Sequence, residues 1–255
     1  IPGYSSAVPG IQVGTQLPSD ASDELQQFTR QLGVEWVMTG VREREGHTAK
    51  TYRAIRQRFE QQGLQVYRLA NHYCHNMEAV TLALPERDEK IAEYLRYIRN
   101  LGAAGIRYST YAHMANGIWS TRREQIRGGA MARAFHLEGA REGRWGDRHW
   151  RAPLTHGRAY SEDELWHNYA YFIGQVVPVA EEAGVYIGIH PDDPPVNPLG
   201  GVPRCIFGTF EGYKRALEIA DSPNIGVCLC VGCWLEGGMA MGGDAEGSGE
   251  ANTAL

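Results

Sequence analysis

A histidine and two aspartates follow a short apolar run in the segment YIGIHPDDPP, residues 186–195. The run is bounded by turn residues and predicts a buried strand that ends near His190. Polar side chains at the carboxyl end of a parallel strand lie where α/β folds place their chemistry. His190 and Asp192 would share one face if the strand continued. The alternative is structural, since a lone histidine at a strand end is usually only hydrogen-bonded and Asp-Asp-Pro-Pro is also a common loop sequence.

Three of the five cysteines, Cys228, Cys230 and Cys233, crowd into six residues. A C-x-C-x-x-C run without a fourth thiolate is a weak signal for a zinc or iron–sulfur cluster. We expect a strand over residues 225–231, on which Cys228 and Cys230 point to one face while Cys233 lies past the strand end. Cys228 then suits a small buried position, whereas Cys230 reaches the edge of the sheet that carries His190.

One imidazole, one thiolate and nearby carboxylates suit a divalent transition metal. His190 and Cys230 are therefore candidate metal ligands. His72 and His75 come at the end of an expected earlier strand on the same edge, so they are candidates to join the site.

Alternating strands and helices must position these residues. We expect strands over residues 11–16, 34–39, 64–69, 105–111, 185–190 and 225–231, and helices over 20–33, 48–63, 85–102, 163–184 and 209–220. Such alternation is typical of parallel βα units. A Gly-rich phosphate turn after an early strand, typical of a Rossmann sheet, is absent from the sequence. We therefore predict an α/β fold of the (β/α)8 barrel type over residues 1–236, incomplete at its C-terminal end because six strands do not close eight.

Two segments interrupt the alternation. Residues 113–160 form a long insertion on the rim, rich in arginine, glycine and tryptophan, and a loop of this length is usually functional or disordered. Its aromatic and arginine content favours a cover over the active site. Residues 237–255 are rich in Gly, Ala and Ser, and this composition predicts a flexible tail.

Composition narrows the classes of partner. The net charge of −5 gives no reason to expect nucleic acid or an anionic membrane. No apolar stretch is long enough to span a bilayer, and no signal peptide is visible. An odd number of crowded cysteines is a poor disulfide framework and suits a reducing cytoplasm. We also expect a homo-oligomer.

Several segments of the chain resemble the mannonate dehydratase family. They are residues 82–89 (LALPERDE), 98–100 (IRN), 104–106 (AGI), 178–185 (PVAEEAGV), the HPDDPP stretch at 190–195 with GVPR at 201–204, and CVG at 230–232. The HPDDPP motif with its downstream Val-Pro-Arg is the most specific of these.

This resemblance implies a xylose-isomerase-like (β/α)8 barrel that uses Mn²⁺, Fe²⁺ or another divalent metal. The implied reaction removes water from D-mannonate and gives 2-keto-3-deoxy-D-gluconate. The resemblance carries over metal-ligand positions to His190 and Cys230, with Asp192 and Arg204 beside the site. The family's further histidine and acidic ligands lie beyond Cys230, and the chain has no counterpart of them after Gly237.

For such a hydro-lyase of sugar acid metabolism, a base removes the C2 proton and an acid protonates the departing C3 hydroxyl. The candidates for catalysis are Asp192, His75 and Tyr111, and those for binding the anionic substrate are Arg204, Arg123 and Arg127. Two alternatives stay open. One is a sugar isomerase or epimerase on the same barrel, and the other is a non-catalytic, degenerate member of the family.

Overall fold

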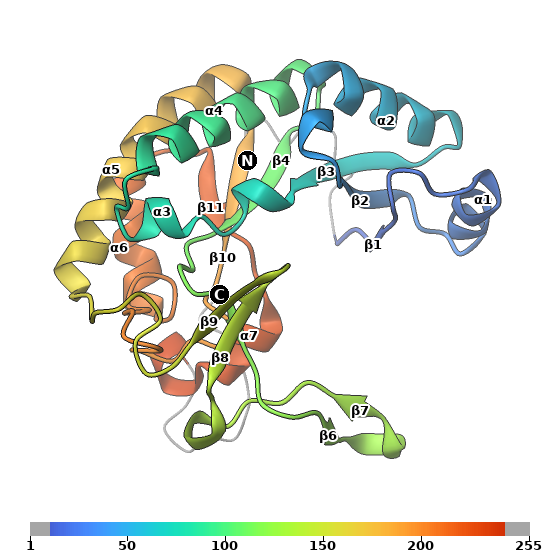
Figure 1. Ribbon diagram of the computed structural model, residues 1–255. Helices are drawn as coiled ribbons and strands as arrows, with labels where there is room; N and C mark the ends of the chain where they lie inside the picture. The colour runs from blue at the N-terminus through green and yellow to red at the C-terminus, as the bar shows by residue number, and fades with distance from the viewer. Residues whose placement is uncertain (1–10, 243–255) are drawn as a thin grey trace.

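The structure, a computed structural model, describes residues 11–242 and contains a six-stranded parallel sheet (Figure 1). Its strands are β1 (Gly14–Gln16), β2 (Trp36–Val41), β3 (Gln65–Asn71), β4 (Tyr108–Ala112), β10 (Tyr186–His190) and β11 (Ile225–Val227). They lie side by side in this same order. Two parallel strands that follow each other in the chain need a crossover connection, and here the connections contain helices.

Helices cover one face of the sheet, so the core lies between two layers (Figure 1). The long helices are α1 (Asp23–Gln31), α2 (Ala49–Gln61), α4 (Arg87–Ala103), α5 (Glu162–Ala183) and α6 (Phe210–Ala220). Shorter helical elements are α3 (Glu78–Thr81), α7 (Val231–Glu236) and the 3₁₀ turns η1 (Arg44–Gly46), η2 (His72–Cys74), η3 (Arg127–Gly129), η4 (Leu137–Gly139) and η5 (Gly238–Met241). Helices α2, α4, α5 and α6 pack against one another in sequence.

Side-chain caps fix where the helices begin. The capping residues are Ser22, Thr48, Ser161 and Thr209, each of which accepts a hydrogen bond from a backbone N–H in the first turn. Such a cap contributes about 1 kcal/mol. At the other end of α5, Gly184 adopts a left-handed conformation with φ of 60°, which a residue with a side chain adopts at a cost. The chain therefore leaves α5 and enters β10 two residues later.

Aromatic rings fill the layer between β4 and the helices. Tyr94, Tyr111 and Phe172 are buried and contact one another with centroid separations of 5.5, 5.4 and 4.9 Å. Tyr97 donates its hydroxyl hydrogen bond to the carbonyl oxygen of Leu69 at 2.6 Å. Burying a ring such as that of Phe172 contributes about 1.5–3 kcal/mol. This packing holds β3 and β4 and so fixes the positions of their carboxyl ends.

The predicted α/β fold is confirmed, although the sheet is open within residues 11–242. β1 and β11 are its terminal strands, so the described part of the chain supplies six strands of the expected eight-stranded ring. Three predicted strands extend well past the observed ones. β1 begins at Gly14, β4 begins at Tyr108, and β11 ends at Val227, after which the Cys228 N–H still bonds to Ile189 before α7 begins at Val231.

The segment 113–160 folds as two small antiparallel sheets. One consists of β5 (Ile118–Trp119), β8 (Glu142–Trp145) and β9 (Arg148–Arg151), and the other of β6 (Glu124–Gln125) and β7 (Met131–Ala132). Figure 1 shows β8 and β9 below the carboxyl ends of the barrel strands, while the β6–β7 hairpin projects away from the body.

The C-terminal boundary differs from the predicted one at residue 236. Residues 238–241 form η5, and the side chain of Met241 is buried in the main core. The ordered part therefore continues past residue 236. The rest of the predicted flexible tail, residues 243–255, lies outside the described residues. No helix among residues 11–242 is long and apolar enough to cross a membrane.

Candidate metal centre

The carboxyl ends of β10 and β11 bring an imidazole and two thiols together. His190 is the last residue of β10, Cys230 caps the start of α7, and Cys233 lies in its first turn. The ligand atoms of these three residues all lie within 4.8 Å of one another. The register aligns Ile189 with Val227, so both chains leave the sheet at the same level. Nitrogen and sulfur donors at this spacing fit a divalent transition metal.

The hydrogen bonding of His190 leaves one ring nitrogen for an ion. Its Nδ1–H donates to the carbonyl oxygen of Pro191 at 2.7 Å, in the tautomer that this contact implies. Nε2 then carries the lone pair. Burial lowers the pKa of His190, which favours the neutral ring that a metal ligand requires. A backbone carbonyl in this position also fixes the orientation of the ring.

Cys233, which the sequence placed past the strand end and away from the candidate site, lies beside Cys230 in the structure. The reasoning assumed a strand through residue 231, which would carry Cys233 away from the site. The strand instead ends at Val227, and the first turn of α7 returns the chain so that Trp234 N–H bonds to the Cys230 carbonyl at 3.1 Å. Cys233 thereby faces Cys230, and burial raises the pKa of its thiol. The usable signal was the C-x-x-C spacing at a helix start.

Carboxylates border the centre on one side. Asp193 and Glu236 each place an oxygen within 4.8 Å of the Cys233 sulfur and of each other. Arg133, from the inserted segment, donates to Asp193 Oδ2 at 2.8 Å. Because this ion pair occupies Asp193, the carboxylate is tied to the insertion as well as to the sheet.

Asp192, a predicted catalytic residue, is buried rather than open to the rim. Its side chain is 3 % exposed, and its backbone N–H donates to the Phe207 carbonyl at 3.0 Å. Burial raises the pKa of Asp192 to about 6, although the positive charge of Arg204 opposes the rise. Asp192 and Arg204 are thus both buried, and the charge of each acts on the pKa of the other.

The prediction that Arg204 binds substrate is corrected by its surroundings. Its side chain donates to the carbonyl oxygens of Pro194 at 2.8 Å and Gly117 at 2.7 Å, and to Oδ1 of Asn116 at 3.0 Å. The residue is buried, so its guanidinium presents no open face. Arg204 instead joins the loop after β10 to the start of the inserted segment.

The other two arginines predicted to bind substrate also lie elsewhere. Arg123 and Arg127 are exposed on the projecting β6–β7 hairpin (Figure 1). Arg123 donates to the carbonyl oxygen of Met131 within that hairpin at 2.5 Å. An exposed hairpin that points away from the barrel brings neither side chain to the metal centre.

Tyr111 faces the helices rather than the pocket. Its hydroxyl lies 2.5 Å from His113 Nδ1, and its ring packs on Tyr94 and Phe172. On β4 the side chains of Ser109 and Tyr111 share the face toward the helices, where Tyr97 bonds to Ser109. Tyr111, which the sequence offered as a catalytic candidate at a strand end, thus packs among the helices and does not line the cavity at the ends of β1 to β3.

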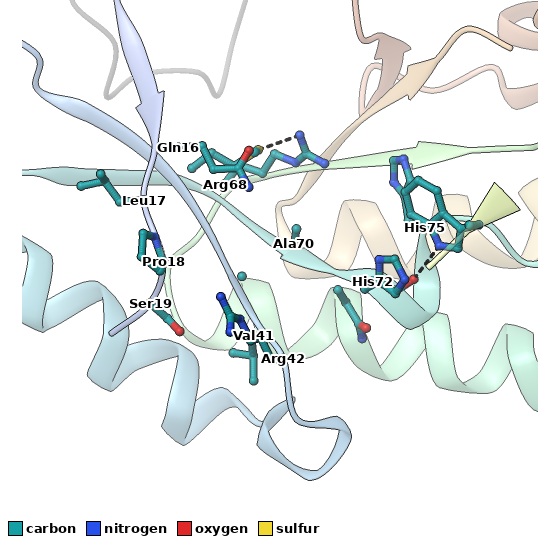
Figure 2. A pocket seen from close by; sticks show the side chains of 14 residues that line it. Gln16, Leu17, Pro18, Ser19, Val41, Arg42, Arg68, Ala70, His72 and His75 are labelled. Carbon is teal, nitrogen blue, oxygen red and sulfur yellow. Dashed lines mark hydrogen bonds between the residues drawn. The ribbon is translucent and has the colours of Figure 1, made fainter. Parts of the chain in front are cut away.

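A cavity of about 720 Å³ opens beside the centre at the carboxyl ends of β1 to β3. Figure 2 shows His72 and His75 at one end of its wall and Arg68 farther along β3. The imidazole of His75 stacks on Trp145 with centroids 5.0 Å apart and lies 6.4 Å from that of His190. Burial lowers the pKa of His75 to about 3, with further contributions from Arg68 and His190. The structure thus brings His75 to the pocket as a neutral ring.

Arg68 is a pocket residue that the sequence analysis missed. Its Nη1 donates to the sulfur of Met38 at 2.9 Å, and its Nε is buried without a hydrogen-bond partner among residues 11–242. No carboxylate in the described part of the chain forms a salt bridge with it. A half-buried guanidinium without an anion is costly, so this position favours an anionic ligand. The sequence signal that could have indicated this residue is an arginine between the apolar residues in the middle of β3.

The chain is similar to known dehydratases over most of its length. The family model for D-mannonate dehydratase (UxuA) matches residues 21–142 and 130–239. A mannonate dehydratase of Streptococcus pneumoniae is 33% identical over 202 residues, which cover 71% of this chain and 53% of that protein. One from Oceanobacillus iheyensis is 29% identical over 195 residues, covering 70% of this chain and 55% of that protein. The chain thus spans about half the length of the curated relatives it matches.

Solved structures give the same fold. The crystal structure of mannonate dehydratase from Streptococcus suis superposes with a TM-score of 0.71 at 28% identity, covering 88% of this chain and 63% of that one. A D-psicose 3-epimerase from Clostridium cellulolyticum superposes with a TM-score of 0.54 at 11% identity, covering 90% of this chain and 71% of that one. At that identity the second likeness concerns the fold alone, which is the xylose-isomerase-like barrel type.

Proposed function

Because the chain belongs to the D-mannonate dehydratase family, we propose that it takes part in the metal-dependent dehydration of D-mannonate to 2-keto-3-deoxy-D-gluconate. The observation that carries the proposal is that His190 and Cys230 come together beside a cavity. Arg68 lines this cavity and forms no salt bridge with a carboxylate of residues 11–242, and its Nε has no hydrogen-bond partner there. A sugar acid has the carboxylate that such an arginine recognises.

His190 Nε2 and Cys230 Sγ are the proposed ligands of a divalent ion, for which Mn²⁺ is the first candidate. Such an ion supplies Lewis-acid stabilisation for the negative charge that develops when the C2 proton leaves. The hydrogen bond from His190 Nδ1 to Pro191 supports this assignment, because it directs the other nitrogen to the ion.

The reaction removes one proton from C2 and hydroxide from C3, and the resulting enol becomes the 2-keto product. Arg68 is proposed to pair with the substrate carboxylate and so to hold C2 near the centre. His75 is the proposed proton-transfer residue, since its ring lies in the pocket wall between Arg68 and His190. Asp192 is proposed to be a positioning residue. Its charge interaction with Arg204 would keep the loop after β10 in place.

The β8–β9 hairpin is proposed to cover the pocket and limit the entry of water. Trp145 stacks on His72 with centroids 4.7 Å apart as well as on His75, so the indole already lies over the mouth. Gly146 turns the hairpin with φ of 63°, and a Cβ there would lie 2.7 Å from His72 Nε2. The turn therefore approaches His72 as closely as only a glycine permits.

We further propose a cytoplasmic homo-oligomer. The five cysteines are all free thiols, as a reducing compartment requires. The projecting hairpin region exposes Ile126, Met131 and Leu137, and apolar side chains on a protrusion suit contact with a second subunit. Sedimentation velocity measures the assembly state.

The test incubates the purified protein with Mn²⁺ and D-mannonate and follows the 2-keto-3-deoxy product. We expect product with the wild type and with Cys228→Ala, a neighbouring thiol outside the ligand group. We expect none with His190→Ala or Cys230→Ala. Activity that survives both substitutions would overturn the assigned centre, and an epimerised sugar without loss of water would indicate an epimerase instead.

A further inference from the structure

We propose that Cys233 is a third protein ligand, so that the centre binds its ion through one imidazole and two thiolates and prefers a thiophilic ion such as Zn²⁺ or Co²⁺. This inference rests on the proposed metal site at His190 and Cys230. It adds a ligand and changes the expected order of metals, because thiolate ligands favour soft and borderline ions over Mn²⁺.

Geometry supports a shared ion. Zinc–sulfur bonds of about 2.3 Å in a tetrahedral site place two sulfurs roughly 3.8 Å apart, and a sulfur and a nitrogen somewhat closer. The three ligand atoms here lie within 4.8 Å of one another, so an ion reaches all of them after only small side-chain shifts. Three ligands from residues 11–242 leave at least one coordination position for substrate, water or a further ligand, as in catalytic zinc sites.

The local fold presents both sulfurs on one side. Cys230 precedes α7 and Cys233 follows three residues later, the spacing with which C-x-x-C motifs commonly place two thiolates on one metal. Trp234 N–H bonds to the Cys230 carbonyl and closes this turn. Cys233 is 4 % exposed, so its sulfur faces the centre rather than solvent.

The carboxylates beside Cys233 also favour a cation. Asp193 and Glu236 each place an oxygen within 4.8 Å of its sulfur, so a Cys233 thiolate would lie beside negative charge that a bound cation offsets. Arg133 forms an ion pair with Asp193 at 2.8 Å, and its charge also acts on Glu236. An ion bound by His190, Cys230 and Cys233 would supply the positive charge that offsets the rest of this negative charge.

The neighbouring Cys228 provides a matched control. It lies two residues before Cys230 and is half-buried, but it is not in the ligand group. Its side chain forms a hydrogen bond with Tyr108 of strand β4 instead. Cys228→Ser therefore changes one thiol in the same segment without changing the proposed donors.

The test titrates the metal-free protein with Co²⁺ and records the thiolate-to-cobalt charge-transfer absorption. Zn²⁺ and Mn²⁺ affinities are then measured by competition. We expect Cys233→Ser to reduce the absorption by about half and to weaken Zn²⁺ binding by at least roughly 100-fold, because loss of a residue that only supports a ligand already costs about 10- to 100-fold. Mn²⁺ affinity should fall much less, and Cys228→Ser should match the wild type.

Unchanged absorption and Zn²⁺ affinity in Cys233→Ser would overturn the inference while leaving the proposed site intact. Absence of any Co²⁺ absorption in the wild type would instead overturn the metal site of the proposed function. X-ray absorption of the zinc-loaded wild type needs no substitution. Two sulfurs at about 2.3 Å would support the inference, and one sulfur would contradict it.

Discussion

The metal centre and the inserted segment 113–160 meet at the same end of the sheet, but different forces position them. The centre depends on neighbouring parallel strands, because the backbone bond from Cys228 N–H to Ile189 at 2.9 Å aligns the two exits from the sheet. In the insertion, the β8–β9 hairpin is held to the rest of the chain mainly by side chains. Trp150 donates to Glu78 at 2.6 Å, and Arg148 donates to the Asn76 carbonyl at 2.8 Å.

This difference separates metal binding, which depends on the strand ends, from covering of the pocket, which depends on the hairpin. A ligand set attached to strand ends keeps its geometry as long as the core between sheet and helices is intact. A cover attached by a few polar contacts can shift without disturbing that core. We therefore expect changes at the strand ends to affect metal and chemistry together, and changes in the β8–β9 hairpin to affect substrate access and the position of His75 without loss of metal.

Removal of the metal should have the largest effect. Chelation of the purified protein should abolish dehydration, a loss of roughly 1,000-fold or more, since Lewis-acid stabilisation supplies several kcal/mol. Added Mn²⁺ should restore it. In a variant with Trp36, Trp166 and Trp234 replaced by phenylalanine, tryptophan fluorescence should change little, because the remaining Trp119, Trp145 and Trp150 all lie in the insertion. A large fluorescence change on chelation would show that the two regions are not independent.

Replacement of Arg68 should have the next largest effect. Arg68→Ala removes the proposed partner of the substrate carboxylate and should lower kcat/KM by about 10- to 150-fold, as expected for a hydrogen bond to a charged group. Metal content should match the wild type. Steady-state kinetics on D-mannonate measure the loss, and an unchanged kcat/KM would place the carboxylate elsewhere.

Loss of the Trp145 indole should weaken the cover without altering the metal. We expect Trp145→Ala to reduce kcat/KM about tenfold by loosening the position of His75, while Trp145→Phe, which keeps a ring for stacking, should retain most activity. Titration with Mn²⁺ provides the second readout. A loss of Mn²⁺ affinity in the alanine variant would contradict the separation of the two regions.

Glu78 should couple the insertion to the barrel in a pH-dependent way. Burial alone would raise the pKa of Glu78, but hydrogen bonds from His156 and Trp150 outweigh it and lower the pKa. A depressed pKa in the folded state stabilises the fold above the unfolded pKa, and this contribution is lost as pH falls through the folded value. Glu78→Gln should therefore cost about 1–2 kcal/mol near neutral pH and progressively less on acidification. Thermal unfolding monitored across this pH range tests the trend, and a constant difference would contradict it.

The smallest effect should come from the projecting hairpin. The double substitution Arg123→Ala and Arg127→Ala should leave kcat/KM within about twofold, because exposed charges contribute little to a site they do not contact. A tenfold loss would mean that the hairpin reaches an active site, either its own or that of a second subunit.

The sequence was sufficient for what depends on local pattern. The apolar run before His190 and the alternation of elements predicted the α/β fold and the end of β10. Both faces of a parallel sheet are buried, however, so alternation along β4 did not reveal that Tyr111 faces the helices. The partners of Arg204 lie 10 to 88 residues away and leave no local signal. Cys233 was missed because the end of a three-residue strand is set by tertiary contacts.

The central claim is that residues from two adjacent strand ends bind one ion. Elemental analysis of the purified protein by mass spectrometry tests it most directly. We expect about one divalent transition metal per chain in the wild type and in Cys228→Ala, and none in the double variant His190→Ala/Cys230→Ala, with circular dichroism showing that all three are folded. A folded double variant that retains a full equivalent of metal would contradict the claim.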